Sequence, residues 1–487
     1  MGKRKEKKKK NQRKSGLDLL LIFWFSLLVV LLAGGALLFA YPQARARLSA
    51  FFTGEAVEKG AEDGKNGNEA ANVSAGGGAG QGLGEKLPSR AEAEESAADD
   101  TSAETEDTPA DTSKYGAVLA DAAYMEENGI YALPAAREES VTLRFAGDIL
   151  FDDEYAVMAT IKQNGGDVTG RFSPELLALM RDADLFMLNN EFPYTKRGEP
   201  TPEKTFTFRA DPETAAFLPE IGVDVVSLAN NHAYDFGEIS LLDSLDTLRE
   251  LGMPYVGAGR NIEEAAKPAY FIIGDIKIGI LAATQIERLD PPDTRGATEK
   301  LAGVFRCWDP KRLLAAIEET KKNCDFCIVF IHWGTENTDE LDWAQLDQVK
   351  KLADAGADAI IGAHPHVLQR LDVVNGVPVA YSLGNFLFNS RTLDTGILEL
   401  VLRRNPAGTA KESSLAVTYQ GTSETADGQA SDTPYVTLSS VRFIPVLQSD
   451  CRAALLSGAE KERVLSYMRE LSEGVYIDGE GYLQLTP

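Results

Sequence analysis

The run Val223-Asp224-Val225-Val226-Ser227-Leu228-Ala229-Asn230-Asn231-His232 gives the clearest indication of how this chain folds. Its apolar part, from Val223 to Leu228, is typical of a buried strand, and it ends abruptly in two amides and an imidazole. Buried strands end in this way where an α/β sheet presents its C-terminal edge to a ligand. The stretch therefore predicts a sheet with a functional site at the ends of its strands.

The histidines of the chain are the second indication of such a site. The 487-residue chain contains four of them, and the other three also follow strand-like apolar runs: His332, His364 and His366. Scattered structural histidines would lie partly on predicted helix faces or in polar segments, and none of these does. His364 and His366 stand two apart on a segment that we expect to be extended, so that both imidazoles face the same way. This clustering predicts a metal or catalytic site.

Strands and helices alternate on both sides of this stretch, from Val141 onward. Strands are expected over 141–145, 184–188, 223–228, 326–331, 359–361, 396–402 and 435–446. Helices are expected after Ser173-Pro174 and Asp211-Pro212 and over 239–251, 311–322, 342–355 and 460–472, the last of which closes the chain. Hairpins are expected at 270–282 and 367–383, where Asn375-Gly376 favours a type I′ turn. The expected fold class is α/β, a layered sandwich of packed mixed sheets flanked by helices.

The N-terminal part of the chain has the composition of a membrane anchor and a spacer. A basic block is followed by the uncharged run Leu19 to Ala40, which as a helix would reach ~33 Å, enough to cross a bilayer. A cleaved signal peptide is the alternative, but the run is longer than a signal core. We expect a cytoplasmic tail (1–16), a transmembrane helix (17–40), an acidic extracytoplasmic linker (41–140), the main domain (141–450) and a C-terminal helical segment (451–487).

Charge and cysteine usage exclude some functions. The net charge is −25, and residues 141–487 hold 32 basic and 52 acidic residues, so that the outer domain is a poor binder of nucleic acid. Cys324 and Cys327 have C-x-x-C spacing, but no second C-x-x-C exists to complete a zinc site. Core packing is the preferred interpretation of the cysteines over a redox or disulfide role.

Polar residues at the strand ends supply the candidate chemistry. Parallel strand ends lie side by side, so residues far apart in the sequence converge there. A set of carboxylates, imidazoles and an amide suits a divalent ion such as Mn, Fe or Zn, and two ions sharing a carboxylate would clamp an anionic oxygen and activate water. Each residue alone also has a structural interpretation as a cap, a turn residue or a packed side chain. The set comprises Asp148, Glu191, Asn231, His232, His332, His364, His366 and Asn385.

These motifs, in this order, resemble the CapA family of poly-γ-glutamate capsule biosynthesis proteins, which is similar to calcineurin-like metallophosphatases. They are Ala-Gly-Asp148, Asn-Asn-Glu191, Ala-Asn-Asn-His232, His332-Trp-Gly-Thr-Glu336, Gly-Ala-His364-Pro-His366 and Ser-Leu-Gly-Asn385-Phe. The resemblance implies metal ligation by Asp148, Glu191, Asn231, His332, His364 and His366. It implies His232 as catalytic acid, and Lys204, Arg209 and Asn385 as candidates for holding substrate anions.

One departure from the resemblance concerns the metals. Metallophosphatases begin with Asp-x-His, and Leu150 stands here in place of that His. One ion would have only Asp148, Glu191 and His366, so that we expect one firm metal and a second that is weak or absent. The main hypothesis is a membrane-anchored metallohydrolase-like protein serving an anionic polymer. The alternatives are a non-catalytic metal-binding subunit of a polymer-export complex and a general surface phosphoesterase or esterase.

Overall fold

The structure is a computed structural model that describes residues 113–287, 294–405, 423–424, 430–431 and 435–485. All of these belong to one compact unit, Glu106–Pro487. The expected cytoplasmic tail, the transmembrane helix and the linker up to residue 112 lie outside the described residues. Within the described ranges, no helix combines the length and the apolar character needed to cross a membrane.

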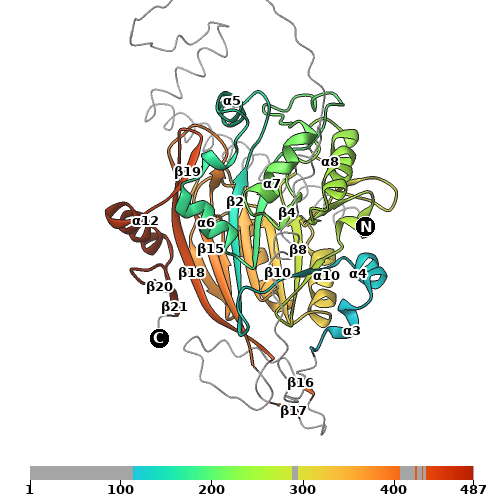
Figure 1. Cartoon of the computed structure of the whole chain (residues 1–487), viewed down its shortest axis with the longest axis vertical. Helices are drawn as coiled ribbons and strands as arrows, with labels where there is room; N and C mark the ends of the chain where they lie inside the picture. Colours follow the sequence, from blue (N-terminus) through green and yellow to red (C-terminus); the bar gives the residue numbers. More distant parts are fainter. Residues whose placement is uncertain (1–112, 288–293, 406–422, 425–429, 432–434, 486–487) are drawn as a thin grey trace, which may run out of the picture. The chain divides into compact units, whose positions relative to one another are not determined.

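Two large sheets form the centre of the described unit (Figure 1). The first has the order β19-β18-β15-β2-β3-β4-β5, with β14 also beside β2. Its strands β2, β3, β4, β5 and β14 run parallel, whereas β15, β18 and β19 extend it in antiparallel fashion. The strands are β2 (Ser140–Ile149), β3 (Leu185–Asn190), β4 (Val225–Ser227), β5 (Tyr255–Val256), β14 (Asn385–Leu387), β15 (Leu393–Arg404), β18 (Val436–Ser449) and β19 (Arg452–Leu455).

The second sheet has the order β1-β7-β8-β10-β11-β13-β12. Its central strands β8, β10, β11 and β13 run parallel, and hairpin partners lie beside β8 and β13. The strands are β1 (Ile130–Leu133), β7 (Ala269–Ile273), β8 (Ile276–Thr284), β10 (Phe326–His332), β11 (Ala359–Ala363), β12 (Leu371–Val374) and β13 (Val377–Ala380). Short two-stranded pairs are formed by β6 (Ala258–Gly259) with β9 (Gly303–Val304), β16 (Ser423–Glu424) with β17 (Ala430–Ser431), and β20 (Val475–Ile477) with β21 (Leu483–Leu485).

The two sheets pack face to face, with helices on the outer faces. One hydrophobic core joins side chains of β2 and β3 to side chains of β8, β10 and β11. A second core lies between the first sheet and α5, α6 and α8, and a third lies between the second sheet and α10 and α11. This arrangement confirms the expected layered sandwich of mixed sheets flanked by helices. Sheets buried on both faces explain why their strands read as continuous apolar runs.

Several helices begin or end at local sequence signals. Ser173 caps α6 by accepting the N–H of Leu176, and Gly252 ends α8 in the left-handed conformation. Asp342 and Gln345 form a capping box on α11. The helices are α3 (Gly116–Leu119), α4 (Ala122–Asn128), α5 (Ala156–Gln163), η1 (Thr169–Arg171), α6 (Pro174–Arg181), η2 (Pro212–Ala216), α7 (Phe217–Glu220), α8 (Glu238–Leu251), α9 (Ile262–Ala265), α10 (Lys311–Lys322), α11 (Trp343–Asp354) and α12 (Gly458–Leu471).

Three boundaries differ from the expectations. The folded part begins before residue 141, because β1 pairs with β7 and so incorporates residues assigned to the linker. The helix expected after Asp211-Pro212 starts as the 3₁₀ helix η2. The segment after residue 450 is not only helical, since β19 precedes α12 and the hairpin β20–β21 follows it. β1 has a partner that is distant in sequence, whereas β19 forms a hairpin with β18 and β20 forms one with β21. Strands this short give little local signal.

Candidate metal centre

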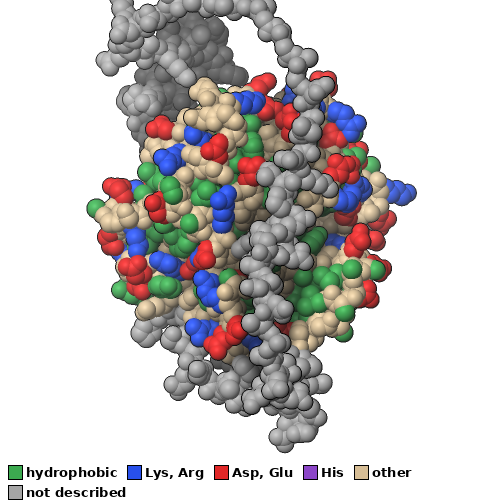
Figure 2. Space-filling model, viewed as in Figure 1, with side chains coloured by type: hydrophobic (Ala, Val, Ile, Leu, Met, Phe, Trp, Pro, Cys, Tyr) green, Lys and Arg blue, Asp and Glu red, His purple; other side chains and the backbone are tan. Residues whose placement is uncertain are grey.

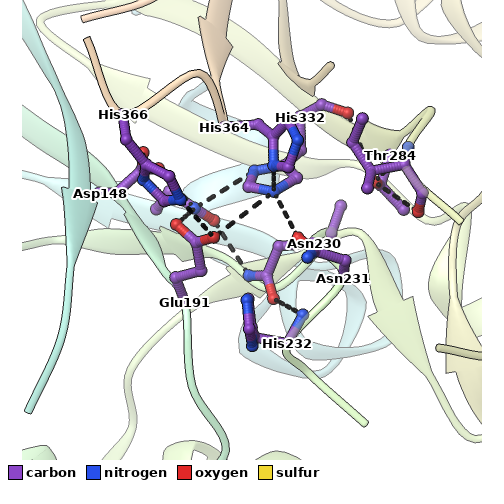
Figure 3. A network of polar contacts seen from close by, with 12 residues as sticks. Asp148, Glu191, Asn230, Asn231, His232, Thr284, His332, His364 and His366 are labelled. Carbon is purple, nitrogen blue, oxygen red and sulfur yellow. Dashed lines mark hydrogen bonds and ion pairs between the residues drawn. The ribbon is translucent and has the colours of Figure 1, made fainter. Parts of the chain in front are cut away.

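Strand ends from both sheets meet at one place (Figure 3). Asp148 lies near the end of β2, opposite Asn189 of β3, and Glu191 follows β3 directly. His332 ends β10 opposite Ala363 of β11, and His364 comes next in the chain. Six of the predicted residues thus lie in one cluster, in which His366 is half-buried and the other five are buried: Asp148, Glu191, Asn231, His332, His364 and His366.

The backbone around the cluster is unusual. A Cβ on Gly147 would lie 1.8 Å from the carbonyl oxygen of Gly384, so only glycine allows β2 to approach that loop. His364 and His366 have φ values of 101° and 60°, which cost non-glycine residues about 1–3 kcal/mol each. The prediction of an extended segment there is therefore wrong, because the chain bends at both histidines. Such strain is concentrated at functional sites in proteins.

Glu191 lies between two groups of side-chain atoms that could ligate a metal. Its Oε1 is 3.7 Å from Nε2 of His332 and 3.8 Å from Nε2 of His366. On the His332 side, Nε2 lies 2.9 Å from Oδ1 of Asn231 and 3.1 Å from Nδ1 of His364. On the His366 side, Nδ1 lies 3.3 Å from Oδ2 of Asp148. Donor atoms of Asp148, Glu191 and His332, and separately of Glu191, His364 and His366, all lie within 4.8 Å of one another.

Two carboxylate oxygens in the cluster lack a hydrogen-bond donor. Among the described residues, Oδ2 of Asp148 and Oε1 of Glu191 accept no hydrogen bond, although both side chains are completely buried. The nearby imidazole nitrogens do not meet hydrogen-bond geometry toward these two atoms. A buried anionic oxygen without a donor is costly, and a cation is the usual partner that removes the cost. The donor set therefore fits a divalent ion with oxygen and nitrogen ligands.

Burial and neighbouring charges shift the pKa values in the cluster. Burial and the negative charge of Asp148 raise the pKa of Glu191 well above its usual value. Burial and the neighbouring imidazoles lower the pKa of His332 and of His364 well below the usual value, which favours the neutral form that ligates metals. Burial acts to lower the pKa of His366, but the carboxylate of Asp148, 3.3 Å from its Nδ1, outweighs burial and raises the pKa.

Two amides that the sequence reasoning did not single out hold the carboxylates in place. Asn189 donates from Nδ2 to Oδ1 of Asp148 at 2.7 Å and to Oε2 of Glu191 at 3.3 Å. Asn230 donates in turn to Oδ1 of Asn189 at 3.0 Å. Asn189 is the first residue of the motif Asn-Asn-Glu191, and Asn230 directly precedes the predicted ligand Asn231 in the motif Ala-Asn-Asn-His. The doubled asparagines were therefore the available signal.

His232 stands at the border of the cluster and contacts a residue that was also missed. Its Nδ1 lies 2.7 Å from Oδ2 of Asp235, which is completely buried. Burial lowers the pKa of His232, and Asp235 opposes that effect only in part. An acidic residue three positions after the histidine was the available signal for this partner.

The three predicted substrate-binding residues have different surroundings. Lys204 donates from Nζ to Oδ1 of Asp235 at 2.6 Å and also contacts the carbonyl oxygen of Asn231. The guanidinium of Arg209 lies 4.5 Å from the ring centre of Phe236. Oδ1 of Asn385 lies 2.8 Å from Nδ1 of His366. Lys204 and Asn385 thus contact the predicted site residues themselves, whereas Arg209 packs on an aromatic ring beside them.

Comparison with known proteins is consistent with this geometry. Residues 142–390 match the family described as "Bacterial capsule synthesis protein PGA_cap". The chain is 30% identical over 276 residues to the "PGA biosynthesis protein CapA" of Bacillus subtilis (strain 168), covering 56% of this chain and 70% of that protein. It is 31% identical over 305 residues to the "Capsule biosynthesis protein CapA" of Bacillus anthracis, covering 60% and 71%. It is 27% identical over 219 residues to a "Probable polyglutamine synthesis accessory protein" of Mycobacterium tuberculosis, covering 43% and 58%.

Proposed function

Because this chain belongs to the bacterial capsule synthesis protein family, we propose that it assists the synthesis, export or surface attachment of an anionic polymer such as poly-γ-glutamate. The printed names of its relatives, which refer to capsule, PGA and polyglutamine synthesis, support this role. The region matched by the family contains every candidate site residue from Asp148 to Asn385. The polymer role and the buried cluster therefore belong to the same part of the chain.

The proposed location is the outer face of the cell membrane. The support is the sequence alone: a basic N-terminal block, an uncharged run from Leu19 to Ala40, and an acidic spacer after it. In this arrangement the N-terminus stays in the cytoplasm and the two-sheet domain works outside, beside the membrane components that make or export the polymer.

The proposed chemistry is metal-dependent hydrolysis of a phosphoester or related bond. The observation that carries it is a pair of buried oxygens that accept no hydrogen bond from the described residues, Oδ2 of Asp148 and Oε1 of Glu191, which lie 3.3–3.8 Å from ring nitrogens of His332 and His366. Asp148, Glu191, Asn231, His332, His364 and His366 would hold the ion. A divalent ion bound there supplies Lewis acidity toward an anionic oxygen and makes water a better nucleophile near neutral pH.

The chain's own residues supply the proton transfer and the orientation in this proposal. In its doubly protonated form, His232 would give the proton on Nε2 to the leaving-group oxygen and keep the proton on Nδ1 that faces Asp235. Asn385 orients the ring of His366 through its contact with Nδ1. Asn189 holds the carboxylates of Asp148 and Glu191 in place by donating a hydrogen bond to each of them. Burial of the cluster excludes bulk water from the ligands, which strengthens each electrostatic contact.

A non-catalytic metal-binding subunit of a polymer-export complex is the second candidate, and one observation favours it. Leu150 occupies the position at which metallophosphatases carry a histidine, and its side chain is completely buried. The His366 side of the cluster therefore has one nitrogen ligand fewer than that pattern. A site of this kind holds one ion firmly and need not retain hydrolysis.

Metal analysis combined with a phosphodiester assay on the purified full chain tests these candidates. The hydrolase proposal predicts a bound divalent metal and turnover that falls about 10²–10⁴-fold in His232→Ala, with the metal retained. Metal without turnover would favour the non-catalytic subunit. Absence of metal from the wild-type protein, even after incubation with Mn, Fe or Zn, would contradict both.

Genetic complementation separates a capsule role from general phosphoester hydrolysis. We expect deletion of the coding sequence to reduce surface polymer, the wild-type chain to restore it, and Asp148→Ala not to restore it. Turnover in vitro with unchanged surface polymer after deletion would favour a general surface phosphoesterase instead.

A further inference from the structure

A cavity of about 980 Å³ lies outside the candidate metal centre. It borders the segment after β9, where Thr284 at the end of β8 donates its N–H to the carbonyl oxygen of Phe305 at 2.9 Å and accepts the N–H of Cys307 at 2.8 Å. This volume is near the upper end of the range for small-molecule sites, about 300–1,000 Å³. The described residues that line the cavity include none of the candidate site residues, so it is a separate site.

Trp308 forms an aromatic wall of this cavity and is held in place although it is 55% exposed. Its ring meets that of Trp343 on α11 edge to face, with centroids 5.7 Å apart. Gln348 of the same helix donates from Nε2 to the carbonyl oxygen of Cys307 at 2.9 Å, which fixes the backbone beside Trp308. A large ring that is fixed before binding gives contact area to a ligand at little cost in entropy.

A turn at 298–301 forms another wall, and it is also fixed. The hydroxyl of Thr298 accepts the backbone N–H of Leu301 at 3.0 Å, and its carbonyl oxygen accepts the N–H of Ile262, at the start of α9, at 2.8 Å. The exposed side chain of Leu301 and the half-buried side chain of Ile262 both line the cavity. The cavity therefore has preformed apolar surface on more than one side, as ligand sites commonly do.

The charges that line the cavity nearly cancel, because four basic and three acidic side chains are present. Arg306 forms an ion pair with Glu287. Lys311 forms one with Asp309 at 2.9 Å. Acidic and basic side chains are likewise interspersed over the described part of the face drawn in Figure 2. A polyanion in the cavity would meet three carboxylates on a domain that is already strongly acidic, so the charges favour an uncharged ligand.

We propose that this cavity binds a neutral oligosaccharide, with a sugar ring packed on Trp308 and its hydroxyl groups hydrogen-bonded to the charged side chains. The C–H groups on the face of a sugar ring are weakly positive and pack on the negative face of an aromatic ring. A guanidinium only donates and a carboxylate only accepts, whereas a hydroxyl does both. Arg312 and Glu299 supply one group of each kind at the cavity. This inference goes beyond the proposed function and does not rest on it.

The surface of a lipid bilayer is the rival occupant, because tryptophan and basic side chains are enriched at membrane interfaces. Two features of the cavity favour the oligosaccharide. The site is concave, whereas a bilayer presents a broad surface, and its three carboxylates would be repelled by the negative charge of anionic lipid. A neutral ligand that enters the cavity meets neither obstacle.

Isothermal titration calorimetry on the purified full chain tests the proposal, with tetra-N-acetylchitotetraose and cellotetraose as the two neutral probes. We expect at least one of them to bind the wild-type chain and Trp308→Ala to weaken that binding at least about 10-fold. Trp308→Phe, which keeps an aromatic face, should weaken it less. Tyr476→Ala is the matched control, because it removes an exposed aromatic side chain from β20, away from the cavity, and it should leave the affinity unchanged.

Salt and competing ligands separate a neutral from an anionic ligand. The affinity for the oligosaccharide should change less than about twofold between about 0.05 and 0.5 M NaCl, because no net charge is neutralised on binding. Failure of the wild-type chain to bind either probe, or equal binding by Trp308→Ala, would overturn the proposal. So would tighter binding of poly-γ-glutamate or of anionic phospholipid vesicles that is lost in Trp308→Ala. Asp148→Ala should keep the oligosaccharide affinity, so that failure of the proposed metal chemistry and failure of this proposal are distinguishable.

Discussion

The two ends of the parallel strands use aspartate and glutamate in opposite ways. At the N-terminal ends, an aspartate stands directly before each of β3, β4, β10 and β11, and each one accepts the backbone N–H of the preceding strand in the sheet. Asp184 accepts from Thr142, Asp224 from Phe186, Asp325 from Lys277 and Asp358 from Cys327, at 2.6–2.8 Å. In return, the backbone N–H of each aspartate donates to the carbonyl oxygen of the residue whose N–H its side chain accepts. These carboxylates extend the ladder of the sheet.

At the C-terminal ends, the carboxylates are satisfied only in part. Asp148 and Glu191 share the donor of Asn189, and each keeps one buried oxygen without a donor among the described residues. The same kind of side chain therefore stabilises the fold at one edge and is left available for a ligand at the other. Structural and functional carboxylates in this domain therefore differ in how many of their oxygens accept a hydrogen bond, and not in residue type or burial.

Glu191→Gln is expected to have the largest effect. The amide removes the charge between the two sets of ligands, so metal affinity should fall by at least about 100-fold. The metal-free protein should unfold at the same or a higher urea concentration, because a buried charge beside Asp148 is lost. Metal content by mass spectrometry and urea unfolding after chelation measure the two effects. A large loss of stability in the metal-free variant would place Glu191 among the structural carboxylates.

Asp184→Asn at the opposite edge should show the reverse pattern. Asp184 accepts the N–H of Ala136 at 2.6 Å and that of Thr142 at 2.7 Å, and asparagine can accept only one of them at its oxygen. We expect a loss of about 1–3 kcal/mol in the free energy of unfolding, with metal content unchanged. The same two measurements apply. Reduced metal binding with unchanged stability would contradict the assignment of structural carboxylates to the N-terminal ends of the strands and ligand carboxylates to the C-terminal ends.

Substitution of Asp275, which precedes β8, should have the smallest effect on stability, and that effect should depend on pH. Burial acts to raise its pKa, but hydrogen bonds from Ser113 and Tyr435 outweigh it and lower the pKa below the ordinary 3.8. A carboxyl with a lowered folded-state pKa stabilises the fold above its unfolded pKa, and that stabilisation is lost as the pH falls through the folded value. Asp275→Asn should therefore unfold about 1 kcal/mol more easily above about pH 5 and match the wild-type protein in acid. Urea unfolding across that range checks it, and a gap that is constant with pH would contradict the expectation.

Local sequence patterns define most of the individual helices, strands and turns, and they identify the residues of the cluster. Apolar runs, Ser173 before Pro174, Gly252 after a helix and Asn375-Gly376 between strands act over a few residues, so their effects can be read in order along the chain. The strand-end rule also placed Asp148, Glu191 and Asn231 at one edge of the first sheet, and the three histidines of the cluster at one edge of the second. The meeting of the two edges depends on how the two sheets pack.

The packing of the whole domain fixes which atoms of those residues have no hydrogen-bond donor among the described residues, and which neighbours hold them. The pairing of β1 with β7, the donation of Asn189 to two carboxylates and the contact of Lys204 with Asp235 each join segments whose partners depend on the packing of the whole domain. Hydrogen-bond satisfaction is a property of three-dimensional neighbours. Periodicity along the chain does not encode it, since an aspartate accepts a backbone N–H or has no donor depending on which strand lies beside it.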